Sequence, residues 1–170
     1  MSRLLSFLLL FFSLRNISFS QQANAGQAYP RIIGYASVSH TIVTFDKNGS
    51  IFNFSGNYTV GFPFGINILK SEKLGFSFEL TPIIKAENGT DKVSNFSFNP
   101  GIIFRLKHRF AFTTRMAFET SGRYGLTPVL SKILFTKNNI NYFIAVPLPF
   151  RLGNDKPASL GVGLQLGISF

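Results

Sequence analysis

The residues of this chain that could do chemistry are four charged side chains and one histidine. Glu79, Arg105, Arg115 and Glu119 all lie on the polar side of segments that alternate between apolar and polar residues. Side chains of a strand point to opposite faces with period 2, so these four are expected to share one face. Opposite charges in a low-dielectric interior pair with one another. We therefore expect a salt-bridged network that fills the interior, with a proton or ion path as the alternative.

His40 lies between two hydroxyl residues, Ser39 and Thr41. Acyl-transfer chemistry would need a hydroxyl within reach of the imidazole and an acid that orients it. Adjacent strand residues face opposite sides, so Ser39 cannot serve His40. The sequence has no cysteine, no metal-ligand cluster and no Gly-rich phosphate loop. We expect no catalytic residues, no metal and no cofactor, and so a protein that is not an enzyme.

The elements that must position these residues are strands, and the last one is the clearest. From residue 158 to the end of the chain, apolar residues occupy every second position, and small or polar residues occupy the others. This pattern predicts a strand with one wholly apolar face. The apolar positions are Ala158, Leu160, Val162, Leu164, Leu166, Ile168 and Phe170.

Seven further strands are predicted upstream, separated by segments rich in Gly, Asn, Ser and Lys. They lie at residues 32–45, 57–68, 74–82, 96–106, 110–119, 126–135 and 141–151. Five of them have one apolar face. An even number of strands is typical of bacterial single-chain membrane barrels. The sequence therefore predicts an all-β fold, an eight-stranded antiparallel up-and-down transmembrane β-barrel.

Two of the seven strands have apolar residues on both faces. In residues 32–45, His40 favours an inward orientation for its own face, because an ionisable group is better placed in the interior. In residues 126–135, Lys132 favours turning Val129, Ile133 and Phe135 outward, since a lysine that faces lipid at the bilayer midplane costs about 2 to 4 kcal/mol. Both orientations are expectations that the remaining strands do not fix.

The connections between the strands alternate in length. A three-residue loop at 107–109 pairs Leu106 with Phe110 and Phe104 with Phe112, which keeps both apolar faces on one side. With both ends of the barrel on the periplasmic side, the turns at 70–73, 107–109 and 136–139 are periplasmic. The loops that begin near Asp46, Glu87, Ser121 and Asn154 then face outward.

The amino terminus is predicted to be a secretory signal peptide at residues 1–25. Arg3 precedes the apolar run at 4–14, which is too short to span a bilayer as a helix. Small residues offer cleavage after Ser20 or after Ala25. A single β-barrel domain, residues 26–170, would then remain.

Composition favours a membrane protein over the alternative, a soluble secreted β-barrel that binds an apolar ligand. Only 14% of the 170 residues are charged and 21 are Phe, whereas soluble domains carry about 25% charged residues. The polar faces are rich in small residues, which suits a narrow lumen. The net charge is +10, but the basic residues are scattered, so we expect no nucleic-acid partner and instead contact with anionic lipid headgroups.

The signal peptide, the eight alternating strands and the terminal Phe170 resemble the superfamily of small eight-stranded bacterial outer-membrane barrels. This superfamily includes outer membrane protein X and the transmembrane domain of outer membrane protein A. The resemblance implies a monomer in the outer membrane, in contact with lipid and lipopolysaccharide. It also implies that Leu164, Leu166, Ile168 and Phe170 form the signal for the barrel-assembly machinery.

The superfamily also includes small pores and lipid A-modifying enzymes. The His-x-Ser spacing of the lipid A deacylases is absent, because Thr41 and Ile42 follow His40. We therefore expect a structural or surface-interaction role for the protein, with a small-solute or ion pore as the alternative.

Overall fold

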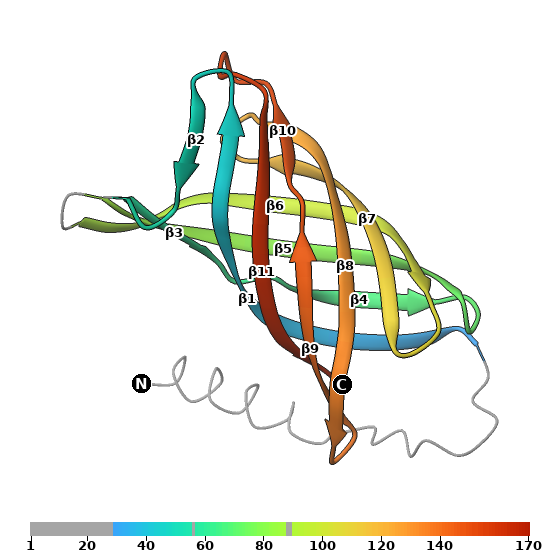
Figure 1. Ribbon diagram of the computed structural model, residues 1–170. Coiled ribbons are helices and arrows are strands. Elements are labelled where there is room, and N and C mark those ends of the chain that lie inside the picture. Colours follow the sequence, from blue (N-terminus) through green and yellow to red (C-terminus); the bar gives the residue numbers. More distant parts are fainter. Residues whose placement is uncertain (1–28, 56, 88–89) are drawn as a thin grey trace, which may run out of the picture.

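The computed structural model describes residues 29–55, 57–87 and 90–170, and these residues form one antiparallel β-sheet that closes on itself (Figure 1). The sheet has eleven strands that fill eight positions of a ring. The strands are β1 (Arg31–Asp46), β2 (Gly49–Phe52), β3 (Asn57–Gly61), β4 (Phe64–Leu69), β5 (Leu74–Glu87), β6 (Thr90–Arg105), β7 (Phe110–Glu119), β8 (Tyr124–Lys137), β9 (Ile140–Pro147), β10 (Phe150–Leu152) and β11 (Ser159–Ser169).

The first and last long strands close the ring. β11 pairs antiparallel with β1, from Tyr35 opposite Ser169 to Phe45 opposite Leu160. The terminal Phe170 extends this pairing, since its backbone N–H and C=O each bond to Gly34 at 3.0 Å. Closure leaves the ring without an unpaired edge, which is what a sheet in a membrane requires.

Prolines divide two of the ring positions, and β2 shares the position of β3 and β4, so eleven strands fill eight places. β3 and β4 both lie between β1 and β5, and Phe62 and Pro63 separate them. β9 and β10 both lie between β8 and β11, and Leu148 and Pro149 separate them. A proline has no N–H to give to the ladder, so the pairing pattern is interrupted while the chain continues in the same direction.

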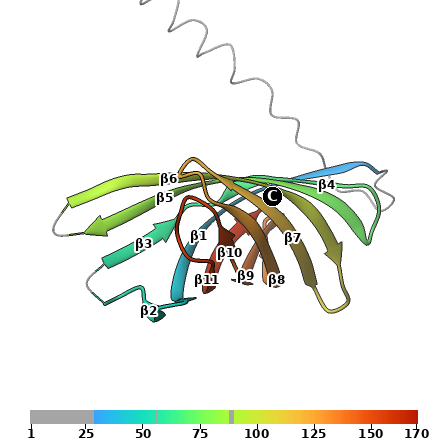
Figure 2. The same cartoon turned by 90° about the horizontal axis from the view of Figure 1, so that it is seen from above.

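The two ends of the ring differ. One end carries the start of β1, the C-terminus and the turns at 70–73, 106–109 and 138–139, and it is called the turn end below (Figure 1, bottom and right). The opposite end, called the loop end, carries the β1–β2 hairpin and the connections at 120–123 and 153–158. The β5–β6 hairpin also belongs to the loop end and projects beyond the rest of the wall in both views (Figure 2). The loop predicted at 86–92 is mostly strand, because the pairing of β5 and β6 continues to Glu87 and Thr90.

Large apolar side chains cover the outer face of the ring, and small or polar side chains fill its inside. Phe64, Phe98 and Phe118 are each between 46% and 47% exposed, whereas Ser77 and Ala117 have no exposed surface. The predicted apolar faces of residues 57–68, 74–82, 96–106, 110–119 and 158–170 all point outward. A soluble barrel that binds an apolar ligand would have the reverse arrangement.

The predicted orientation of the first strand is wrong over its first two thirds. Tyr35 is 5% exposed and points inward, whereas Ile32 and Val38, on the face of His40, are exposed. A register shift between Thr41 and Val43 then reverses the alternation. Such a bulge adds one residue to one strand. It places apolar residues of both parities on the outer face, which is why the alternation in the sequence was ambiguous.

The predicted outward orientation of Val129 and Ile133 is wrong, whereas that of Phe135 is confirmed, because a register shift between Ile133 and Phe135 turns Phe135 outward, where it is 51% exposed. Val129 is 4% exposed and, with Ile133, lines the inside of the ring, while Leu130 and Lys132 are exposed on the outer face. The pairing with β7 imposes this, because Val129 lies opposite the inward Thr113. The free-energy cost of a lysine that faces lipid at the bilayer midplane is avoided, because Lys132 lies near one end of the barrel. Lys132 lies opposite Phe110 beside the turn end, and its ammonium group rests 4.8 Å from the centre of the Phe110 ring.

Within the described part of the chain, no helix has the length and apolar character needed to cross a bilayer. The predicted signal peptide at 1–25 lies outside the described residues.

Candidate functional site

Polar side chains from opposite walls meet in the middle of the lumen and form what we call the central cluster. Its members are Tyr35 on β1, Ser77, Glu79 and Thr81 on β5, Asn99 on β6 and Arg115 on β7. Five of these side chains lie on the polar parity of their strands, so the alternation of the sequence points them inward, whereas Tyr35 lies on the face of β1 that was expected to point outward. All are buried.

Arg115 and Glu79 are at the centre of this cluster. Arg115 Nη1 lies 3.2 Å from Glu79 Oε2, while Arg115 Nε donates to the Ser77 hydroxyl at 3.2 Å. Arg115 can cross the lumen because Gly101 lies opposite it on β6, where a Cβ would collide with the Arg115 stem at 2.8 Å. An ion pair so deeply buried needs further hydrogen bonds to offset its desolvation.

Neighbouring groups supply those hydrogen bonds to the Glu79 carboxylate. The Tyr35 hydroxyl donates to it at 3.0 Å, and the Asn99 amide and the Thr81 hydroxyl donate at 3.1 and 3.2 Å. Tyr35 in turn accepts a bond from Arg115 Nη2 at 3.2 Å. β1 and β7 are four positions apart in a ring of eight, so this last bond spans the lumen.

The other two residues of the predicted network lie elsewhere. Glu119 is near the loop end, where its Oε1 is 2.6 Å from Arg151 Nε and its Oε2 accepts bonds from Asn95 and Ser121. Arg105 is at the turn end and is exposed. The four predicted residues thus separate: Glu79 pairs with Arg115, Glu119 pairs with Arg151, and Arg105 lies apart from both pairs at a cavity.

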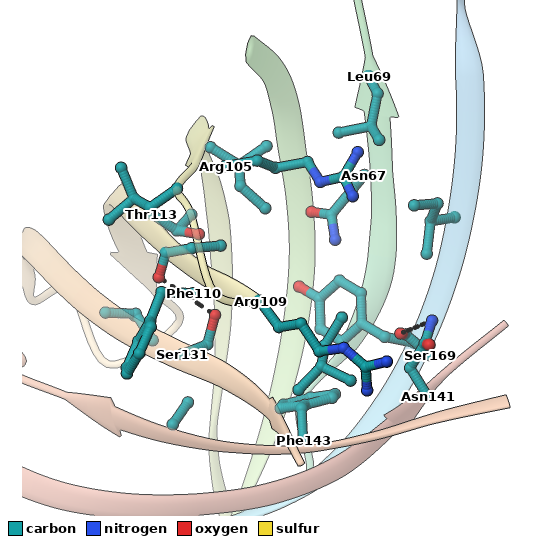
Figure 3. Close-up of a pocket in the computed structure, with 18 of the residues that line it drawn as sticks. Asn67, Leu69, Arg105, Arg109, Phe110, Thr113, Ser131, Asn141, Phe143 and Ser169 are labelled. Carbon is teal, nitrogen blue, oxygen red and sulfur yellow. Dashed lines mark hydrogen bonds between the residues drawn. The ribbon is translucent and has the colours of Figure 1, made fainter. Parts of the chain in front are cut away.

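That cavity, called the turn-end cavity below, occupies the lumen between the central cluster and the turn end (Figure 3). Its volume is about 360 Å³. Arg31, Arg105 and Arg109 line it together with apolar side chains such as Ile103 and Val129, and Arg115 of the central cluster lines it as well. In Figure 3, Arg109 extends from its turn toward the side of the cavity that carries Asn141 and Ser169.

His40 is on the outer face of the ring, which corrects its expected inward position. Its Nδ1 is 2.6 Å from the Tyr58 hydroxyl, and the two rings lie 5.8 Å apart. Ser39, on the opposite face, pairs across the strands with Gly61 and Gln165. The structure therefore places no hydroxyl nucleophile of the same strand beside the imidazole. Among the described residues, no group of His, Asp or Glu side chains could hold a metal ion.

The residues of the predicted assembly signal form one outward stripe on β11 and its end. Leu164 and Leu166 are exposed, and Phe170 is 65% exposed. A Cβ on Gly34 would lie 2.7 Å from the Phe170 ring, so the absence of a side chain at residue 34 lets that ring approach the wall of β1. The stripe is thus displayed on the strand that closes the ring.

Sequence reasoning missed several residues of these sites. Tyr35 was hidden by the bulge in β1, and Arg109 was assigned only to a turn. Asn99 and Arg151 lie on the polar faces of alternating segments, but without alignment of the strands their partners cannot be named. The one available signal was the position of Asn99 and Arg151 on alternating segments, which an inter-strand register would have converted into contacts.

No protein-family model matches the sequence, and no curated protein matches it. The fold is similar to those of designed transmembrane β-barrels. The solution NMR structure of the de novo designed TMB2.3 gives a TM-score of 0.51 at 9% identity, over 86% of this chain and 97% of that chain. A structure from the de novo design of transmembrane β-barrels gives 0.49 at 10% identity, over 85% and 97%. At such low identity the first likeness shows the fold alone, a transmembrane β-barrel, and carries no activity with it.

Proposed function

We propose that this protein is an integral barrel of the bacterial outer membrane that serves a structural or surface-interaction role and does not conduct solutes. The apolar outer face supports the membrane setting, because a lipid surrounding removes the cost of so many exposed Phe and Leu side chains. The β1–β2 and β5–β6 hairpins of the loop end are the surfaces that such a barrel would display outside the cell.

The observation that carries the non-conducting role is the central cluster. Arg115 crosses the lumen from β7 and bonds to Tyr35 on β1 as well as to Glu79 on β5. Tyr35 also packs against Phe143 on β9, with 6.5 Å between the ring centres. An eight-stranded barrel has room inside only for side chains of this size. These contacts, which reach four strands, support a lumen that is closed to solutes at this depth.

The experiment is conductance of the purified barrel in planar lipid bilayers. We expect no unitary current steps above those of the bare bilayer at physiological salt, with insertion verified in the same preparation by protease protection in vesicles. A second chain with Arg115→Gly, which removes the crossing side chain, is the positive control and is expected to leak. Regular current steps from the unaltered protein would reject the non-conducting role and favour the ion-path alternative.

A further inference from the structure

The turn-end cavity carries positive charge that the central cluster does not neutralise. Four arginines line it, at 31, 105, 109 and 115, and no Asp or Glu does. Arg115 is paired with Glu79 at 3.2 Å. Among the described residues, the guanidinium groups of Arg31, Arg105 and Arg109 form neither an ion pair nor a hydrogen bond.

Like charges around one hollow repel each other, and low-dielectric walls concentrate their field inside it. An anion between the three guanidinium groups would remove this repulsion. Guanidinium groups bind carboxylates through paired, parallel hydrogen bonds, which adds geometry to the attraction. The charge pattern thus selects an anion and disfavours a cation.

Part of the wall of the same cavity is apolar. Ile33, Ile103, Val129, Ile133 and Phe143 line it, and Ile103 and Val129 are at most 9% exposed. A hydrated inorganic ion would leave this wall in contact with water, whereas an organic anion would cover it. A volume of about 360 Å³ is within the usual range for sites of small organic ligands.

One polar atom of the wall has its hydrogen-bonding capacity unused. Asn67 Oδ1 is buried and has no hydrogen-bond partner among the described residues. In Figure 3, the Arg105 side chain extends toward Asn67. A buried acceptor without a donor costs free energy, so a ligand that donates a hydrogen bond to it would bind more tightly.

We propose that the turn-end cavity is a binding site for a small amphipathic organic anion, a carboxylate with a short aromatic or branched apolar body. The carboxylate lies among Arg31, Arg105 and Arg109 at the mouth. The apolar body lies against Ile103 and Val129, above the central cluster. The site binds and retains its ligand from the turn end and needs no passage through the lumen, so it is independent of whether the barrel conducts.

The test uses benzoate as the probe and the full barrel in nanodiscs of neutral phosphatidylcholine, which contribute no competing anion. Isoleucine and valine methyl groups are observed by NMR. We expect saturable shifts of the Ile103, Val129 and Ile133 methyl signals with benzoate. Benzyl alcohol, which has the same ring without the charge, should shift them at least tenfold more weakly, and inorganic phosphate should also bind at least tenfold more weakly. Equal affinities for benzoate and phosphate would overturn the apolar part of the site.

Substitutions test which positive charges bind the carboxylate. Arg105→Gln with Arg109→Gln should weaken benzoate binding at least tenfold. Lys132→Gln removes one positive charge near the same end of the barrel but from the outer face, and should leave binding unchanged. Arg109→Gln alone, in an exposed turn, covers the case in which the double variant fails to fold, with a loss of about threefold or more. Absence of saturable shifts in the unaltered barrel, or equal effects of Lys132→Gln and Arg109→Gln, would overturn the site.

Discussion

At the scale of residues, the barrel interior depends on a carboxylate and a guanidinium group that are nearly excluded from water. The side chains of Arg115 and Glu79 are 7% and 8% exposed, and five further hydrogen bonds, to Tyr35, Ser77, Thr81 and Asn99, surround them. Breaking such a pair is far more costly than replacing both partners, because the remaining charge stays buried. This asymmetry provides a test of the central cluster.

Glu79→Gln keeps the size of the side chain and removes its charge, which leaves Arg115 without a counter-ion. We expect the free energy of unfolding to fall by about 3 to 5 kcal/mol. Urea titration of the barrel in phosphatidylcholine vesicles, followed by its gel mobility, measures this. Glu72→Gln, in the exposed turn between β4 and β5, is the matched control and should have no effect.

The double variant Glu79→Gln with Arg115→Met should recover much of the lost stability, since it removes both charges. Conductance should stay absent in Glu79→Gln. Unchanged stability together with altered conductance in that variant would contradict a structural role for the ion pair.

At the scale of elements, most strands were predictable, and the exceptions have local causes. The single apolar faces of β5, β7 and β11 fix their orientation without any knowledge of their neighbours. The bulge in β1 placed apolar residues of both parities outward. In β8, the pairing with β7 decided the orientation against the expectation drawn from Lys132, whose long side chain rests over Phe110 beside the turn end. Register is a property of strand pairs, so a single segment cannot reveal it.

The candidate sites were also predictable only in part, because their contacts depend on how the strands are aligned. The sequence placed Glu79 and Arg115 on inward faces, and the structure brings them together. The sequence did not indicate that Glu119 pairs with Arg151 from another strand, at 2.6 Å. Nor did it indicate that Arg105 shares a cavity with Arg31 and Arg109. Glu119 and Arg151 are far apart in the chain, as are Arg105 and Arg31, and only the pairing of the strands brings each of these two sets of residues to one place.

The orientation of β8 can be tested cleanly because the chain has no cysteine. A spin label on Leu130→Cys should meet oxygen dissolved in lipid, because Leu130 is 47% exposed on the outer face. A label on Ser131→Cys, inside the turn-end cavity, should meet little of it. Electron paramagnetic resonance with oxygen as relaxant measures both. Higher oxygen accessibility at residue 131 than at residue 130 would show that the strand is turned the other way.

β11 offers a second test at this scale. Deleting Phe170 removes two backbone hydrogen bonds to Gly34 at the seam of the ring and the ring that packs there. We expect the yield of inserted barrel in cells to fall severalfold. Phe112→Ala, an exposed aromatic on β7 away from the seam, should change the yield little. Equal yields from the two variants would mean that β11 ends as an ordinary wall strand and not as an assembly signal.

At the scale of the whole molecule, the chain is a closed barrel with an apolar outer face, and the surroundings that we propose for it are lipid. An apolar outside, a polar inside and a ring without edges are mutually consistent only in that setting. The ion pairs of the interior are compatible with it because the wall encloses them, and the three arginines of the turn-end cavity are compatible because they lie at its mouth, at the turn end.

The most direct measurement is fractionation of cells that express the chain, followed by gel electrophoresis with and without boiling. We expect the protein in the outer-membrane fraction, with one mobility in the unboiled sample and a different mobility after boiling, because a closed barrel resists detergent until heat unfolds it. Recovery of the protein in the soluble periplasmic fraction, with the same mobility before and after boiling, would contradict the account.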